Sequence, residues 1–90
     1  MKLIWSESAR QKRLEICRYI ARDNYDAARR MNQLIKRAAC GLLSFPQKGR
    51  IGIVSNTREL VIHPNYILIY TIADDVIEIL AIVHAAQQYP

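Results

Sequence analysis

The sequence predicts an α+β domain in which an N-terminal helical hairpin packs on a small, twisted antiparallel β-sheet. Two observations lead to this fold class. In the first half of the chain, apolar residues recur at three- and four-residue spacing, the period of an amphipathic helix. The second half holds three short runs of β-branched and aromatic residues, separated by polar or proline-containing breaks, as in an antiparallel meander. Ninety residues suit one domain, so we expect residues 1–90 to form a single unit.

The chain opens with a short segment suited to a strand and then a helix. Residues 2–5 alternate weakly and fit an edge strand, with the charge of Lys2 protecting that edge. Ser6 is a good N-cap for a helix that we expect to run to about Arg22. The apolar stripe of this helix consists of Ala9, Ile16, Cys17 and Ile20.

A short polar break leads into a second helix, which Asn24 or Asp26 can cap. Its apolar residues recur at helical spacing, and we expect Pro46 to end it, because proline pushes the preceding residue out of the helical region. So short a break predicts an antiparallel helical hairpin. A turn-rich connector, residues 46–52, follows and leads into a short strand around residues 51–53.

Three strands then form the meander, at residues 58–62, 66–72 and 76–83. In the last strand, strict alternation groups the side chains into two faces. One face is wholly apolar and should pack on the helices; it holds Ile77, Ile79, Ala81 and Val83. The other face is mixed, carries Glu78 and His84, and should be open to a partner.

The charge is unevenly distributed along the chain. Residues 1–50 carry twelve Lys and Arg against four Asp and Glu, whereas residues 51–90 carry one basic residue, Arg58, against four acids. Such asymmetry indicates an anionic partner, either a nucleic acid or an acidic protein segment. Solvated helix faces explain the same pattern equally well.

Several classes of protein are disfavoured by the sequence. No apolar run reaches the ~20 residues that a membrane-spanning helix needs. The apolar stretch within residues 1–7 is too short for a secretory signal, and a charged residue, Glu7, follows it too early. We therefore expect a cytoplasmic protein. We expect Cys17 and Cys40 to be small buried hydrophobes. No His or Cys lies at metal-ligand spacing, and we expect neither a metal nor a cofactor.

Catalytic motifs are sparse. The chain has no glycine-rich phosphate loop and no nucleophile elbow. Either histidine, His63 or His84, could act as a general acid or base, and His84 ends the last strand near Tyr89. Arg58 should either pair with a carboxylate, for which Glu78 is the candidate, or reach an anion on a partner.

A series of short motifs runs in a characteristic order along almost the whole chain. They are Tyr19-Ile20-Ala21, Phe45-Pro46, Gly49-Arg50-Ile51-Gly52, Thr57-Arg58-Glu59-Leu60-Val61, Tyr66-Ile67 with Tyr70, and the ending Ile79-Leu80-Ala81-Ile82-Val83-His84. In this order they resemble the RelE/ParE toxins of bacterial toxin–antitoxin modules. The resemblance implies a helical hairpin on a twisted antiparallel sheet. It also implies growth inhibition and neutralisation by a cognate antitoxin.

The resemblance also implies what the partners look like. An acidic, partly disordered segment of the antitoxin would suit the basic helices and fold on binding. The toxin–antitoxin complex would bind operator DNA through the antitoxin.

The family divides by target, and one position bears on the division. ParE-like members poison DNA gyrase without chemistry of their own, whereas RelE-like members cleave mRNA on the ribosome. In RelE-like members the corresponding stretch looks like Tyr-Arg-Leu-Val-Tyr, and its arginine helps to stabilise the phosphate during cleavage. This chain has Tyr66-Ile67-Leu68-Ile69-Tyr70, so Ile67 takes the place of that arginine. An isoleucine cannot offset charge on a phosphorane. The resemblance therefore favours the ParE-like branch.

Two alternatives remain open. The first is a ribosome-dependent endoribonuclease that uses some of Lys48, Arg50, Arg58, His84 and Tyr89. The second is a diverged, non-toxic member that binds only its antitoxin or nucleic acid.

One residue departs from the family pattern. Many relatives have an arginine where this chain has Ala81, which places full toxicity in question. Natural divergence and an inactivating substitution both explain the alanine. The residues expected to contact a target or an antitoxin are Arg50, Arg58, Glu78, Ala81, His84 and Tyr89.

Overall fold

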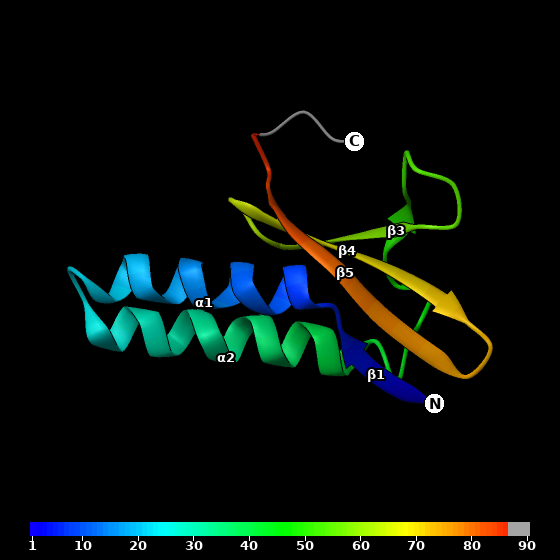
Figure 1. Cartoon of the computed structure of the whole chain (residues 1–90), viewed down its shortest axis with the longest axis horizontal. Helices are drawn as coiled ribbons and strands as arrows, with labels where there is room; N and C mark the ends of the chain where they lie inside the picture. The colour runs from blue at the N-terminus through cyan, green and yellow to red at the C-terminus, as the bar shows by residue number, and fades with distance from the viewer. Residues whose placement is uncertain (87–90) are drawn as a thin grey trace.

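The computed structural model describes residues 1–86. Two helices, α1 (Glu7–Ala21) and α2 (Tyr25–Gly41), form an antiparallel hairpin that lies against one face of a five-stranded sheet (Figure 1). The strands are β1 (Lys2–Trp5), β2 (Arg50–Ile51), β3 (Arg58–His63), β4 (Tyr66–Ala73) and β5 (Val76–His84). The predicted α+β class and the helical hairpin are confirmed.

The strand order is β1-β5-β4-β3-β2, and the sheet is mixed. Strands β2 to β5 are joined antiparallel, as predicted for the meander. Strand β1 lies at the predicted edge, but it pairs in parallel with β5, from Lys2 opposite Val76 to Trp5 opposite Ile79. The prediction of a purely antiparallel sheet is therefore wrong at this edge. A parallel pair needs a long crossover, and the hairpin and meander supply one.

Two side chains cap the helices. The Ser6 hydroxyl accepts a hydrogen bond from the Ala9 N–H at 3.0 Å and donates one to the Leu80 carbonyl at 2.7 Å. Ser6 therefore starts α1 and also fixes it to β5. The Asn24 side chain accepts from the Ala27 N–H at 2.9 Å, so Asn24 is the cap of α2.

Helix α2 ends at Gly41, five residues before the proline that was predicted to end it. From Leu42 to Ser44, each backbone N–H bonds to the carbonyl three residues back, so the helix tightens into turns. Glycine is a poor helix former, which places the break earlier than Pro46. Cys40 is exposed on the last turn, contrary to the predicted burial, and Cys17 is half-buried; both thiols are free.

The core lies between the hairpin and the sheet. Buried residues of the helices meet those of the central strands, and α1 lies along β5 (Figure 1). The hairpin extends past the sheet, so the turn between the helices lies at the opposite end of the molecule from the β4–β5 turn. The largest fully buried side chains are Tyr70, Ile35, Leu42, Leu68, Ile69, Ile77 and Ile79.

Buried Tyr70 fixes the connector between the helices and the sheet. Its hydroxyl donates to the Pro46 carbonyl at 2.7 Å and accepts from the Gly49 N–H at 2.9 Å. A Cβ atom on Gly49 would lie 2.7 Å from that hydroxyl and 2.9 Å from the Glu59 carbonyl oxygen. The connector therefore approaches Tyr70 and the backbone of β3 so closely at Gly49 that only glycine fits there.

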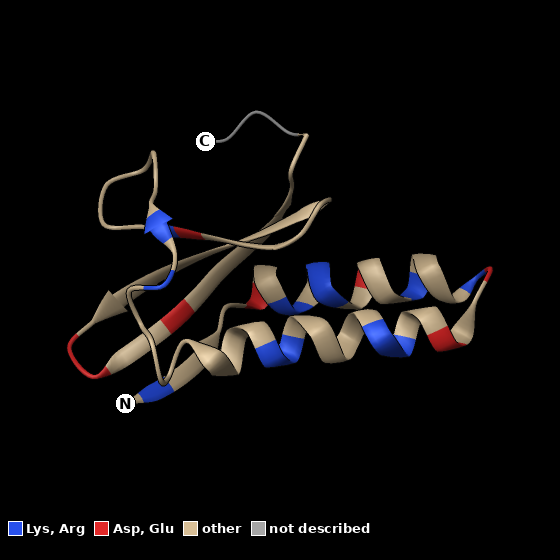
Figure 2. Cartoon of the chain, turned by 180° about the vertical axis from the view of Figure 1, so that it is seen from behind, with Lys and Arg blue, Asp and Glu red and all other residues tan. Residues whose placement is uncertain are grey.

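The positive charge is concentrated on the hairpin (Figure 2). Residues 7–41 carry nine Lys and Arg and four Asp and Glu, while the rest of the chain carries four of each. The net charge of +5 therefore belongs to the hairpin, and the sheet with its connector is neutral overall.

Replacing Ser6 tests the link between α1 and β5. Ser6→Ala removes both hydrogen bonds of the hydroxyl, and we expect a loss of about 1–2 kcal/mol in the free energy of unfolding. Urea denaturation followed by circular dichroism measures this loss. Ser44→Ala, at an exposed serine, is the control, and equal stability of the two variants would contradict the proposed role.

Replacing Tyr70 tests the link to the connector. Tyr70→Phe keeps the ring but leaves the Pro46 carbonyl and the Gly49 N–H without their partner, so we expect a loss of about 1–3 kcal/mol. The same denaturation experiment measures it. Tyr19→Phe removes a hydroxyl from an exposed tyrosine and should leave stability unchanged. A Tyr70→Phe variant as stable as the parent chain would show that the connector is held by other contacts.

Candidate functional site

The pairing of β4 with β5 slips by one residue in mid-strand. Tyr70 lies opposite Ile79, but its neighbour Ile69 lies opposite Ala81. Leu80 is therefore an extra residue, and β5 contains a β-bulge at this point.

The bulge changes which side chains of β5 face the helices. Ile77 and Ile79 do so, as predicted, and Ile82 follows them into the core. Ala81 and Val83 were expected on the same face but lie on the outer face of the sheet, the face turned away from the helices. The prediction was wrong for these two residues because it assumed strict alternation, and a slip of one residue reverses the two faces.

Four residues form a row across this outer face. Ala81, Ile69, Glu59 and Arg50 lie in register on β5, β4, β3 and β2. Beside the row is a small pocket of about 150 Å³, referred to below as the outer pocket. Its lining residues are Arg50, Ile53, Glu59, Ile67, Ile69, Val83, His84 and Ala85.

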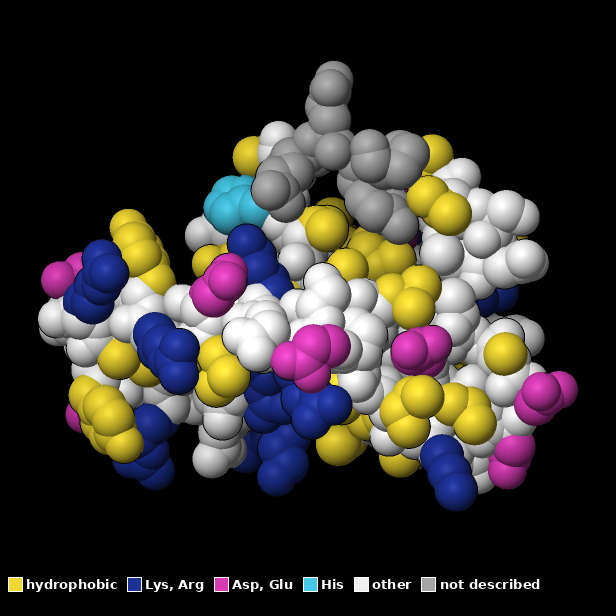
Figure 3. Space-filling model, viewed as in Figure 1, with side chains coloured by type: hydrophobic (Ala, Val, Ile, Leu, Met, Phe, Trp, Pro, Cys, Tyr) yellow, Lys and Arg dark blue, Asp and Glu magenta, His cyan; other side chains and the backbone are white. Residues whose placement is uncertain are grey.

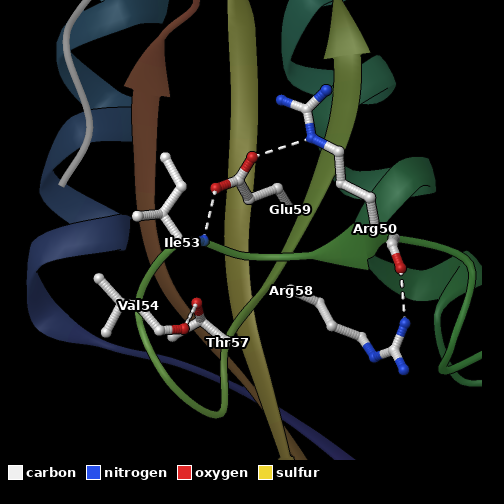
Figure 4. Close-up of polar contacts among 7 residues, drawn as sticks. Arg50, Ile53, Val54, Thr57, Arg58 and Glu59 are labelled. Carbon is white, nitrogen blue, oxygen red and sulfur yellow. Dashed lines mark hydrogen bonds and ion pairs between the residues drawn. The ribbon is translucent and has the colours of Figure 1, made fainter.

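An ion pair between an exposed arginine and a buried carboxylate lies at one side of the outer pocket (Figure 4). The Glu59 side chain is 8% exposed, and its carboxylate accepts from Arg50 Nε at 2.9 Å and from the Ile53 N–H at 3.4 Å. A buried carboxylate needs such partners to offset its lost hydration. The Arg50 side chain remains 61% exposed, so the arginine also reaches solvent. Glu59 was not predicted as a site residue, although a single carboxylate within an apolar strand was a usable signal.

Arg58 bonds to the connector and not to the predicted carboxylate. Its Nη1 donates to the Gly49 carbonyl at 2.7 Å and to the Gln47 carbonyl at 3.4 Å (Figure 4). In the sheet, Arg58 lies opposite Tyr70 of β4, whereas Glu78 lies opposite the next residue of β4, Thr71. Neighbouring residues of a strand point to opposite faces, so the side chains of Arg58 and Glu78 lie on opposite faces of the sheet. The predicted Arg58–Glu78 pair is therefore wrong, and Arg58 holds the connector in place.

A cluster of rings lies where β4 begins and β5 ends. The Tyr66 ring lies between His63 and His84, with centroid distances of 5.7 and 5.6 Å. Backbone N–H groups donate to Nδ1 of both histidines, so a neutral imidazole there carries its proton on Nε2. His84 lines the outer pocket. Glu78 lies on the outer face as predicted, opposite Thr71, but it is farther along β5 and does not line the pocket. Tyr89, expected beside His84, lies outside the described residues.

Exposed apolar side chains lie on β2, on β3 and in the loop between these strands. Ile53 and Val61 are 69% and 56% exposed, and Ile51 on the edge strand β2 is 81% exposed. We call these three residues the apolar surface. Hydrophobic side chains gather in part on the sheet half of the molecule, while the basic ones gather along the hairpin (Figure 3). Exposure of this kind is typical of a surface that binds another protein.

The described part of the chain was also compared with the requirements of a metal site, a reactive thiol and a membrane-spanning helix. Within residues 1–86, no three His, Cys, Asp or Glu side chains lie close enough together to bind a metal. Burial raises the pKa of the Cys17 thiol, and the nearby Arg13 only partly opposes this, so the thiol stays protonated at neutral pH. None of the described helices is long and apolar enough to cross a membrane.

Sequence comparison gives a consistent assignment. Residues 3–89 match the sequence model of the ParE toxin of the type II toxin–antitoxin system parDE. The chain is 41% identical to the protein Y4kP of Sinorhizobium fredii over 90 residues, which cover 99% of this chain and 93% of that protein. It is 35% identical to the toxin RelE2 of Caulobacter vibrioides over 86 residues, covering 96% and 97%.

Solved structures show the same fold. A chain of the chromosomal ParDE toxin–antitoxin system of P. aeruginosa superposes with a TM-score of 0.82 at 22% identity, covering 93% of this chain and 95% of that one. The protein HP0894 of Helicobacter pylori superposes with a TM-score of 0.55 at 22% identity and covers 99% of both chains. With the family match over nearly its whole length, the chain belongs to the ParE toxin family of type II toxin–antitoxin systems.

Proposed function

We propose that this toxin inhibits growth by binding DNA gyrase in the cytoplasm, without catalysis of its own, and that a cognate antitoxin neutralises it. Membership of the ParE toxin family makes the chain the toxin of a type II module. The choice of gyrase follows from the family resemblance and from the contents of the outer pocket.

The main support for a binding function comes from the contacts of the cationic side chains near the outer pocket. Arg50 pairs with Glu59, and Arg58 donates to backbone carbonyls of the connector. Ile67 lines the pocket as an apolar residue. In the RelE-like ribonucleases the resemblance places an arginine at this position. Cleavage of a phosphodiester needs positive groups aimed at the charge that develops on the phosphate. Both arginines have intramolecular partners, which favours a binding function over ribonuclease chemistry.

The apolar surface supports the proposal of an antitoxin partner. The side chains of Ile51, Ile53 and Val61 are exposed on β2, on β3 and in the loop between these strands. A partly disordered antitoxin segment that folds on binding gains its affinity by burying such side chains. We place its apolar residues here, and the complex then binds operator DNA through the antitoxin.

A second candidate function has one specific observation in its favour. His84 and the partly exposed Arg50 line the same pocket, which is an arrangement that a general acid or base and a phosphate-binding group require. In this reading the chain is a ribosome-dependent mRNA endonuclease. Its further candidate catalytic residues are then Lys48, Arg58 and Tyr89.

The gyrase proposal is tested directly with purified toxin and gyrase. We expect the toxin to inhibit DNA supercoiling and to trap cleaved DNA–gyrase complexes, and addition of the antitoxin to reverse both effects. Agarose gels with and without protease treatment measure the two products. Unimpaired supercoiling at a large excess of toxin would count against gyrase as the target.

Mapping of mRNA 5′ ends after induction separates the two functions. A gyrase toxin leaves messages intact while DNA damage accumulates, whereas a ribonuclease produces cuts positioned by codon. If such cuts occur, His84→Ala should abolish them, and His63→Ala is the matched control because His63 contacts the same tyrosine ring outside the outer pocket.

Ala81 offers a test of whether this chain is fully toxic. Ala81→Arg adds a cation to the outer face, opposite Ile69 and in the row that contains Glu59. We expect about tenfold tighter target binding, which corresponds to about 1.4 kcal/mol, and therefore fewer surviving colonies on induction without antitoxin. Ala81→Met controls for side-chain size. Equal survival of the two variants, with no growth inhibition by either, would favour a diverged, non-toxic member.

A further inference from the structure

The outward side of α2 carries four basic residues in a regular arrangement. Arg29 and Lys36 form one row, Arg30 and Arg37 form a second, and Gln33 lies between the rows. Each row joins residues seven positions apart, which is two helical turns or about 10.5 Å. All five side chains are exposed, and we call them the cationic face.

The position of the cationic face follows from the amphipathic pattern of the helix. Ile35, Ala39 and Leu42 are completely buried on the opposite side of α2, which leaves the two rows turned away from the sheet. A shallow depression of about 640 Å³ runs along this side. It is lined by Asp26, Arg29, Arg30, Gln33, Leu34 and Arg37.

Within the described part of the chain, the four cations outnumber Asp26, the one acidic residue that lines the same depression. None of them forms an ion pair there, and the one side-chain hydrogen bond among them joins Arg37 to Gln33 at 3.3 Å. By contrast, Arg50 and Arg58 are both held by the sheet and the connector. The surplus charge of the hairpin is therefore available to an anionic partner (Figures 2 and 3).

The composition of the cationic face favours phosphate over an acidic peptide. A peptide that folds on binding must bury apolar side chains. The hairpin exposes Leu14, Tyr19 and Tyr25, but none of these belongs to the cationic face. The five residues of the face are all polar or charged. Arginine binds phosphate through paired N–H donors, so a phosphate backbone needs only the side chains present here.

The spacing of charge favours a duplex. Double-stranded DNA carries one negative charge per about 1.7 Å of its axis, or about six along a row of this length. A single strand is usually bound by aromatic side chains that stack on its bases, and no aromatic side chain lies between the two rows.

We propose that the cationic face of α2 binds the phosphate backbone of duplex DNA without reading its sequence. This activity is separate from the proposed action on gyrase and from antitoxin binding, because it uses the outward side of the hairpin and not the sheet. It gives the toxin a DNA contact of its own.

Fluorescence anisotropy of a labelled DNA duplex, titrated with the purified full-length toxin, tests the proposal. Four phosphate contacts predict a fall of about 150-fold in affinity between about 50 and 200 mM salt. The double variant Arg30→Gln/Arg37→Gln should weaken binding and lower the slope of log affinity against log salt by about 1.8. Thermal melting confirms that each variant is folded.

A matched control separates the cationic face from net charge alone. Lys2→Gln/Arg10→Gln removes the same charge from β1 and α1, and we expect it to keep most of the affinity. Equal losses in the two variants would overturn the proposal, as would the absence of salt-dependent binding. Tighter binding of poly-glutamate, single-stranded DNA or an RNA duplex than of duplex DNA would assign the face to that partner instead. Gyrase is absent from the assay, so this result does not depend on the target.

Discussion

The hydroxyl of one buried residue connects the two halves of this molecule. Tyr70 is on the central strand β4, and its bonds to Pro46 and Gly49 fix the path of the connector that leaves the helices. That path sets β2 against β3, which in turn brings Arg50 to the buried carboxylate of Glu59. The outer pocket thus depends on a hydrogen bond made on the other side of the sheet. A polar atom in the core is tolerated because both of its hydrogen-bonding functions are satisfied.

Local sequence was sufficient for the elements of this fold but not for their register. Helical periodicity, the caps at Ser6 and Asn24, and the breaks between strands depend on neighbours in the chain, and all of these were predicted. The arginine usual at the position of Ala81 indicated either a bulge or an open sheet edge there. The bulge at Leu80 could not be located from the sequence, because alternation of side chains gives no sign of a slip in pairing. The parallel edge pair and the partners of Arg58 depend on residues far apart in sequence. The resulting errors concern which face Ala81, Ile82 and Val83 occupy, and so they concern the site.

The surface of the toxin is divided by chemistry. The sheet half is neutral overall, exposes apolar side chains and holds its two arginines in internal contacts. The hairpin carries the net charge, and the outward side of α2 exposes four basic residues. Hydrophobic contacts give affinity for a protein partner, whereas exposed cations give long-range attraction to a polyanion. The two surfaces proposed for a protein partner and for DNA therefore share no residues.

The parallel pairing of β1 with β5 has a consequence for synthesis. Residues 2–5 are synthesised well before their partners, residues 76–79, so the sheet gains its edge strand only after those partners have left the ribosome. Contacts this distant in sequence form late and close slowly. Ser6 shares the delay, since its bond to Leu80 spans 74 positions. A nascent toxin therefore holds a helical hairpin before it holds a finished sheet, and this order of assembly allows an antitoxin to meet the chain while it is still incomplete.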